Sequence, residues 1–220
     1  MSPALTQNLI ANTEFKSLNG WTGTYVNSSS KKKAEIENLY GYFSGSTFIS
    51  AYDQFKNGSF DATESKLKYY LKITFEDANS AVINSGPFDN RTVIKNAEKE
   101  DEYAIKYVTG NNSGELRFSL QEYRYDTTSG GYVTGWTSGK KAVFSEPYSK
   151  SGDSEHKFFK VTESNYSEAD FKKSSNVRLC IKAPSNVTFP YTVYLESIEL
   201  FKAVYFTNSS GVQSLITPAD

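Results

Sequence analysis

The run from Lys66 to Glu76, K-L-K-Y-Y-L-K-I-T-F-E, constrains the fold more than any other stretch of this chain. Alternate positions are apolar, and the positions between them are mostly charged or hydroxylated, including Tyr70. A period of two over eleven residues predicts a strand with one buried face and one solvated face. At about 3.3 Å per residue such a strand would span roughly 36 Å, so we expect long neighbouring strands and a second layer over its apolar side. That apolar side consists of Leu67, Tyr69, Leu71, Ile73 and Phe75.

The rest of the chain reads as many short strands separated by turn signals, with little helix. Ala34–Phe43 and Thr47–Tyr52 are predicted to pair around Gly45, and a capping-box spacing at Ser167–Asp170 favours one short helical turn. This pattern predicts an all-β fold, a two-layer antiparallel β-sandwich of the jelly-roll kind. We expect residues 1–202 to form the sandwich and residues 203–220 a C-terminal extension.

Composition excludes several classes of protein. The 220 residues carry a net charge of −1, whereas a nucleic-acid-binding surface needs a basic excess, so we expect Lys31–Lys33 to be a solvated loop. The single Cys180 excludes an intrachain disulfide and a cysteine-built zinc site. No apolar stretch approaches the roughly 20 residues that span a membrane. The start at Met1 lacks the charged and apolar regions of a signal peptide.

Two distant stretches resemble one known family. Asn8–Phe15 followed by Gly20-Trp21 is similar to the opening strand of jelly-roll carbohydrate-binding modules with a galactose-binding-like fold, and Val193–Leu200 is similar to their last strand. Together the two stretches cover about a tenth of the chain. The resemblance implies a jelly-roll sandwich that binds a sugar, with Trp21 at the edge of the core.

The same resemblance bears on calcium. Members of the family often hold a structural calcium ion between a carboxylate after the opening Phe and an Asp of the closing strand. Here Lys16 and Glu196-Ser197 occupy those positions. A lysine argues against an ion that requires several anionic or carbonyl oxygens. Glu14 and Glu196 are the residues that would hold calcium, and we otherwise expect no cofactor.

The closing strand carries a signal of its own. Val193 and Leu195 share one parity, whereas Ile198 and Leu200 share the other. Both pairs can face the core only if the strand contains one extra residue between them. The sequence therefore predicts a β-bulge or sharp bend at Glu196-Ser197.

Candidates for catalysis are few. His156 is the only histidine, and a general base or metal ligand needs a partner that orients it. No strained nucleophile turn and no glycine-rich phosphate loop is present, and no pair of carboxylates stands out for glycoside hydrolysis. We therefore expect His156 to be solvated or structural, and the protein not to be an enzyme.

Aromatic residues between positions 123 and 136 suggest a ligand site. Tyr123 and Tyr125 have the parity opposite to Leu116, Phe118 and Leu120, and Tyr132 and Trp136 return beside them after a turn. Exposed rings next to polar groups suit a sugar, because its apolar face stacks on a ring while its hydroxyls form hydrogen bonds. The alternative is that these four rings only cover the hairpin or contact another subunit.

The C-terminal segment adds a second apolar run, Ala203–Phe206, then a turn at Asn208–Gly211 and a return over Val212–Ile216. Such an extra hairpin is typical of an attachment or oligomerisation device. With the lone cysteine and the absent signal peptide, it resembles phage tail and baseplate proteins, which carry such sandwiches on virions.

Two functions follow as expectations. The first is a non-catalytic module that recognises a surface glycan, on a phage virion tail or attached to an enzyme; the second is a structural virion or assembly protein that uses the sandwich for subunit contacts. The expected partners are a glycan or glycosylated cell surface, other virion or modular-enzyme components, and a second copy in a homo-oligomer. Nucleic acid and membrane insertion are not expected. The expected location is extracellular or on a virion.

Overall fold

The computed structural model describes residues 8–10, 12–26, 31–59, 66–84, 102–110, 114–126, 131–134, 157–160 and 177–216. Their elements are β1 (Trp21–Tyr25), β2 (Glu35–Ser44), β3 (Thr47–Ser50), α1 (Ala51–Lys56), β4 (Lys68–Phe75), β5 (Ser80–Asn84), β6 (Glu102–Thr109), β7 (Arg117–Asp126), β8 (Gly131–Thr134), β9 (Lys157–Lys160), β10 (Val177–Lys182), β11 (Tyr191–Lys202), β12 (Val204–Thr207) and β13 (Gln213–Ile216). The expected solvated loop at Lys31–Lys33 is exposed.

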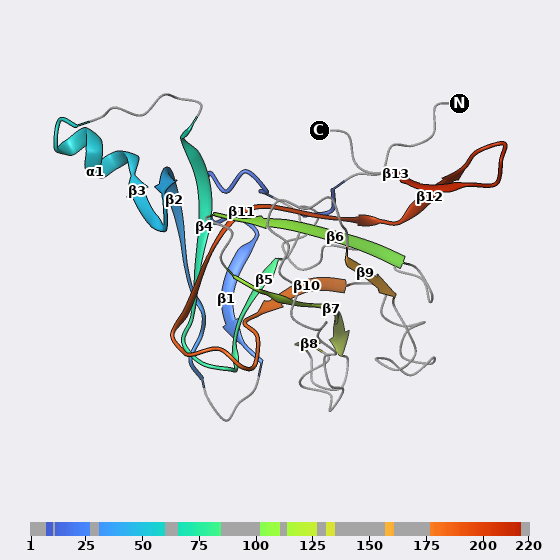
Figure 1. The fold of residues 1–220 in the computed structure, drawn as a ribbon. Coiled ribbons are helices and arrows are strands. Elements are labelled where there is room, and N and C mark those ends of the chain that lie inside the picture. Colours follow the sequence, from blue (N-terminus) through green and yellow to red (C-terminus); the bar gives the residue numbers. More distant parts are fainter. Residues whose placement is uncertain are drawn as a thin grey trace.

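Two antiparallel sheets face each other, as the sequence predicts (Figure 1). One has the order β1-β5-β10-β7-β8 and the other the order β3-β2-β4-β11-β6-β9. The long strand β4 lies inside the second sheet, between β2 and β11. The fold is therefore an all-β sandwich, and the predicted key strand is a central strand of one layer.

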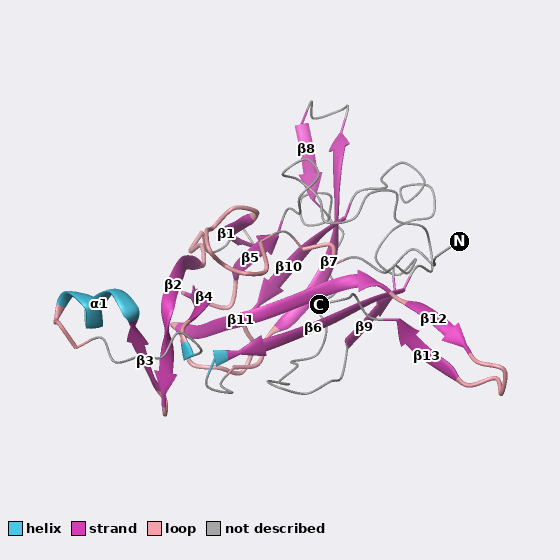
Figure 2. Cartoon of the chain, turned by 90° about the horizontal axis from the view of Figure 1, so that it is seen from above, coloured by secondary structure: helices cyan, strands magenta, loops and turns pink. Residues whose placement is uncertain are grey.

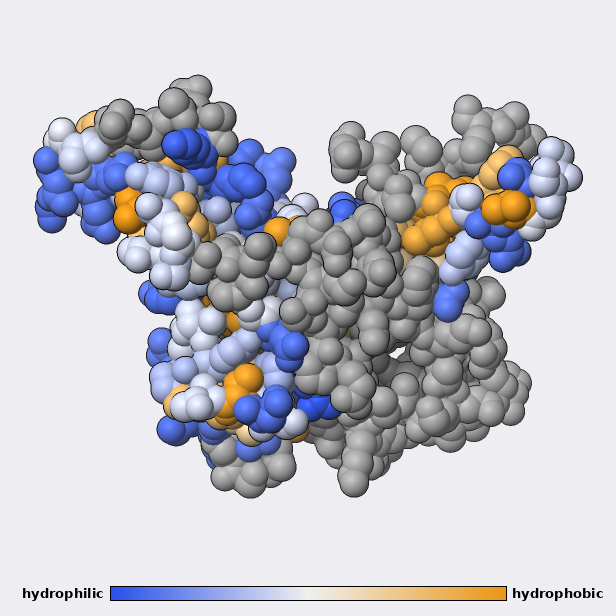
Figure 3. All heavy atoms as spheres, viewed as in Figure 1, coloured by the Kyte–Doolittle hydropathy of each residue, from blue (hydrophilic) through white to orange (hydrophobic). Residues whose placement is uncertain are grey.

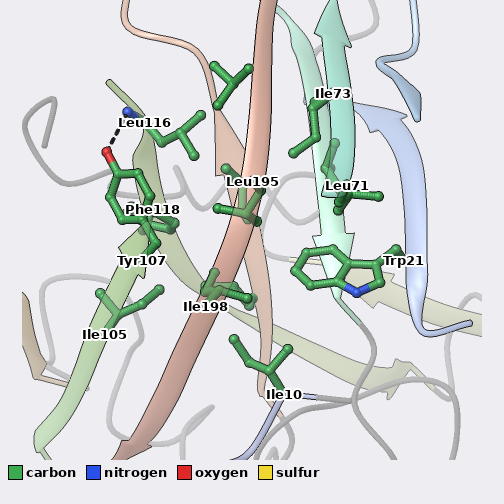
Figure 4. Packing of buried hydrophobic residues seen from close by; sticks show 14 of the residues in the cluster. Ile10, Trp21, Leu71, Ile73, Ile105, Tyr107, Leu116, Phe118, Leu195 and Ile198 are labelled. Atoms are coloured by element: carbon green, nitrogen blue, oxygen red, sulfur yellow. Dashed lines mark hydrogen bonds between the residues drawn. The ribbon is translucent and has the colours of Figure 1, made fainter. Parts of the chain in front are cut away.

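The core lies between the two sheets, where apolar side chains from both interdigitate (Figure 4). Leu71, Ile73 and Phe75 of β4 are fully buried, so the predicted dry parity of this strand is confirmed at these three positions. Trp21 lies in the same core cluster and is 4% exposed. Its indole Nε1 donates a hydrogen bond to the carbonyl of Asn12 at 3.3 Å, which satisfies the one polar atom of the ring.

The prediction that the other parity of β4 is solvated is wrong at Tyr70. This residue is only 4% exposed, because the rings of Phe43 on β2 and Phe48 on β3 pack against it on the outer face of the sheet. Lys72 on the same face is half-buried and forms an ion pair with Glu37. One face of β4 thus fills the core, and the opposite face contributes to a separate aromatic cluster.

The predicted bulge in the closing strand is confirmed. The register of β11 against β6 shifts between Leu195 and Ser197. Val193 and Leu195 before the shift are both fully buried, and so is Leu200 after it. The extra residue changes the parity that faces the core, as the apolar pattern of this strand requires.

Two local predictions need correction. The strand predicted over Thr47–Tyr52 ends at Ser50, and α1 follows it, because the Ser50 hydroxyl accepts a hydrogen bond from the Asp53 amide and caps the helix. The opening Asn8–Ile10 is not a regular strand. It is held to β11 by the hydrogen bond from the Leu9 amide to the Leu200 carbonyl, and by the Asn8 side chain, which accepts from the Leu200 amide.

The predicted C-terminal hairpin is present as β12 and β13, a separate two-stranded sheet that projects from the sandwich (Figure 2). Whether residues 1–202 and 203–220 are separate units stays a prediction. Trp136, His156 and Ser167–Asp170 lie outside the described residues. Among those that are described, no helix is both long and apolar enough to cross a membrane.

Candidate functional site

The predicted aromatic positions lie on the hairpin of β7 and β8. Tyr125 is the register partner of Tyr132, and Tyr123 is the partner of Thr134. Positions that pair across an antiparallel ladder share a face, so the backbone places positions 123, 125 and 132 on one face of this hairpin. Their role as a sugar platform stays a prediction, together with that of Trp136.

Between Glu115 and Ser119, the parity that was predicted to be solvated is exposed only in part. Glu115 before the strand is exposed, but Ser119 on the same parity is 1% exposed. Cys180, its register partner on β10, is fully buried. The outer face of this sheet is therefore covered near its centre, which alternation along one strand does not reveal.

A second pair of aromatic residues, Tyr40 on β2 and Tyr69 on β4, offers a ring to solvent. The two residues are register partners, and their rings stack with centroids 4.5 Å apart and planes inclined by 27°. Tyr40 is 41% exposed. Because stacking on the half-buried Tyr69 holds the ring in place, its exposed surface costs little conformational entropy to present to a ligand.

Polar and charged groups occur on β2 and on a loop that is tied to it. The Asn38 side-chain amide donates a hydrogen bond to the Lys16 carbonyl at 3.3 Å, which ties the loop after Asn12 to β2. The Lys16 ammonium lies 2.5 Å from the Glu14 carboxylate, and both side chains are mostly exposed. The hydrogen bond and charge of Glu14 raise the pKa of Lys16, with a smaller electrostatic contribution from Tyr69.

The loop that carries this ion pair is rigidly built. The Asn12 side-chain amide donates to the carbonyls of Ser17 and Asn19, at 2.5 and 3.2 Å. Asn12 and Phe15 both have positive φ angles, of 55° and 50°. The Phe15 ring is fully buried and packs 5.7 Å from Trp21, so the residues on either side of it, Glu14 and Lys16, face solvent.

Sequence reasoning did not find this group of residues. Alternation of Asn38, Tyr40 and Tyr42 along β2 was a usable signal for one polar-aromatic face. Tyr69 has the parity of β4 that faces the core, so the sequence gives no sign that its ring stacks on an exposed one. Tyr69 lies at the start of β4, next to the partly exposed Leu67 and away from the fully buried centre of the strand.

A third aromatic group covers the outer face of the six-stranded sheet. Phe43 and Phe48 contact each other, and each also contacts Tyr70 and Tyr194, with ring centroids 5.1 to 5.7 Å apart. Gly110 packs against them so closely that a Cβ atom there would lie 2.4 Å from a ring carbon of Phe43. Tight mutual packing of this kind indicates a structural cluster.

The two residues nominated for calcium bind lysines in this structure. Glu14 pairs with Lys16, and Glu196 pairs with Lys68 of β4. Within the described ranges, no group of three or more His, Cys, Asp or Glu side chains is placed to hold a metal ion. A calcium ion at either carboxylate would have to compete with an ammonium group, and the calcium site stays a prediction.

Cys180 offers no nucleophile. It is fully buried, and burial raises the pKa of its thiol to about 12, so the reactive thiolate is not populated near neutral pH.

Comparison with known proteins gives distant structural neighbours only. No protein-family model matches the chain, and no curated protein matches it. One solved structure with a similar arrangement is the enzymatically active domain of tailspike protein 4 of bacteriophage CBA120, at a TM-score of 0.41 and 10% identity over 89% of this chain and 21% of the other. Another is the CBM22-1–GH10 portion of xylanase 10B from Clostridium thermocellum, complexed with xylohexaose. Its TM-score is 0.35, with 11% identity over 93% of this chain and 30% of the other. The chain therefore spans less than a third of either protein.

Proposed function

We propose that this protein is a non-catalytic, jelly-roll-like module that binds a surface glycan. The observation that carries the proposal is the exposed ring of Tyr40, stacked on Tyr69. Asn38 on the same strand as Tyr40 holds the loop that carries the Glu14–Lys16 ion pair. A pyranose ring presents an apolar face, which stacks on an aromatic ring, and a rim of hydroxyls, which require donors and acceptors nearby. Tyr40 supplies the first requirement.

Polar residues of the same region supply the second requirement, the hydrogen-bond donors and acceptors for the hydroxyls of the sugar. The Lys16 ammonium is a donor, the Glu14 carboxylate is an acceptor, and the exposed Asn38 side chain combines both functions. Charge-assisted hydrogen bonds from a Lys–Glu pair are stronger than neutral ones. Positive and negative charges balance here, so the arrangement suits a neutral sugar better than a strongly charged one.

The β7–β8 hairpin is proposed as a second contact surface, through Tyr123, Tyr125, Tyr132 and Trp136. The register of the hairpin supports it, because Tyr125 and Tyr132 are paired across the ladder. A module of this type would act on a virion tail or as part of a larger glycan-active enzyme.

The experiment is a glycan-array screen of the wild-type chain, followed by calorimetric titration with the best ligand. Tyr40→Ala should weaken binding at least tenfold, which corresponds to about 1.4 kcal/mol, while Tyr40→Phe should retain most of the affinity. Tyr52→Ala is the matched control, because Tyr52 is a tyrosine on α1 that is 71% exposed. If no array glycan binds, the proposed function is wrong. If binding occurs and Tyr40→Ala leaves it intact, the Tyr40 site is wrong.

A further inference from the structure

The hairpin formed by β12 and β13 is an ordered element with little to cover it. Its turn is fixed by Asn208, whose amide donates to the Val212 carbonyl at 3.0 Å and whose side-chain oxygen accepts from the amides of Ser210 and Val212, both at 2.9 Å. At its base, the Ala203 amide donates to the Glu102 carbonyl at 2.8 Å. The hairpin therefore leaves the sandwich in a defined direction (Figure 1).

Apolar side chains cover the outside of this hairpin. Phe206 is 60% exposed and Val212 is 57% exposed, and Val204 and Tyr205 are exposed by about two fifths. Figure 3 shows apolar surface gathered on β12 and β13, at the upper right of the molecule. Continuous apolar patches on a soluble surface mark interaction sites.

The edges of the hairpin are also open. In the described part of the chain, β12 and β13 pair only with each other, and their register has no shift that would twist an edge away. Natural proteins protect such edges with charged residues, prolines or bulges. An isolated two-stranded sheet is marginally stable in water, so pairing with further strands would stabilise this one.

The charge of the segment indicates which partner would pair with it. From Ala203 to Ala219 the chain contains no Asp, Glu, Lys, Arg or His. A charged partner would find no complementary group on this surface. A second copy of the same hairpin meets an equally neutral and apolar surface without repulsion, and an edge strand pairs with its own copy about a two-fold axis.

We propose that two copies of this chain associate through their β12–β13 hairpins, which join edge to edge and place Val204 and Phe206 of one copy beside those of the other on one face of the combined sheet. The contact area of two short hairpins is small, so the dimer is weak and forms with rising concentration. The two sandwiches would then be held apart, each with its Tyr40 region free. This association is independent of sugar binding.

Sedimentation velocity of the full chain, from about 1 to about 100 μM, tests the proposal in the range where weak dimers form. The sedimentation coefficient should rise with concentration. Phe206→Asp should weaken dimerisation tenfold or more, because it places a charge in the contact. Phe55→Asp is the matched control, since Phe55 on α1 is 76% exposed, and it should leave dimerisation unchanged. Circular dichroism of both variants checks that they remain folded.

Hydrogen exchange supplies the second measurement. Amides of β12 and β13 should exchange more slowly in concentrated wild-type protein than in Phe206→Asp. A chain that stays monomeric at all concentrations, or equal effects of Phe206→Asp and Phe55→Asp, would overturn the proposal. So would a monomer that co-sediments with phosphatidylcholine vesicles through Phe206, because the hairpin would then be a lipid contact.

Discussion

The hydroxyl of Tyr107 on β6 accepts a hydrogen bond from the Leu116 amide at 3.2 Å and so joins the two layers of the sandwich (Figure 4). Tyr107 is 1% exposed, and its ring packs 5.1 Å from that of Phe118 on β7. The bond satisfies a buried backbone donor at the point where the chain enters β7. A single phenol oxygen thus fixes where β7 begins against the opposite sheet.

Removal of the Tyr107 hydroxyl oxygen should lower the stability of the fold. Tyr107→Phe keeps the ring but leaves the Leu116 amide without this acceptor, which should lower the free energy of unfolding by about 1–3 kcal/mol. Tyr191→Phe is the control, because the Tyr191 hydroxyl bonds the nearby Glu115 carbonyl at an exposed position, and it should cost no more than about 1 kcal/mol. Urea denaturation of both variants measures the difference, and equal losses would contradict the structural role of Tyr107.

Substitutions along β4 should show that both faces of this strand contribute to stability. Leu71→Ala should cost about 2–5 kcal/mol and Tyr70→Ala about 3–5 kcal/mol, because each leaves a cavity in a packed cluster. Lys72→Ala on the same face as Tyr70 should cost no more than about 1 kcal/mol, since its ion pair with Glu37 is partly solvated. Denaturant unfolding that finds Tyr70→Ala as mild as Lys72→Ala would contradict the buried outer cluster.

Stability should fall in mildly alkaline solution because of Cys180. Burial raises the pKa of its thiol to about 12 in the folded state, whereas an unfolded cysteine titrates near 8.5. A raised native pKa means that the unfolded state releases its proton first, so the stabilisation is complete below about pH 8.5 and declines as the pH rises towards 12. Wild type should lose about 1 kcal/mol by pH 9.5 relative to pH 7 from this group. Cys180→Ala should show a flatter pH dependence of its urea midpoint, and identical slopes would exclude this contribution.

A further prediction concerns the aromatic residues proposed as a second contact surface on the β7–β8 hairpin. Tyr125→Ala and Trp136→Ala should leave the thermal midpoint nearly unchanged and weaken glycan binding at least tenfold, if these rings stack on sugar. A ring buried in the protomer would instead cost about 3–5 kcal/mol on truncation, and a ring in a subunit contact would change the sedimentation of the chain. Thermal melts and calorimetric titration of the two variants separate these outcomes.

Several features of the fold follow from local sequence. The parity of Leu71, Ile73 and Phe75 placed one face of β4 in the core, and the change of parity between Leu195 and Ile198 located the bulge in β11. Alternation works here because a strand presents successive side chains to opposite faces. The C-terminal hairpin followed from its turn residues, for the same local reason.

Only the tertiary structure decided what covers each face. Tyr70 is buried because β2 and β3 place Phe43 and Phe48 against it, and the parity of β4 says nothing about those two rings. Tyr40 became a candidate binding residue for a similar reason, since its partner Tyr69 and the loop with Lys16 come from other parts of the chain. A sequence pattern determines which side chains share a face of a strand. Whether that face meets water, a second sheet or another ring depends on long-range packing, which no single strand encodes.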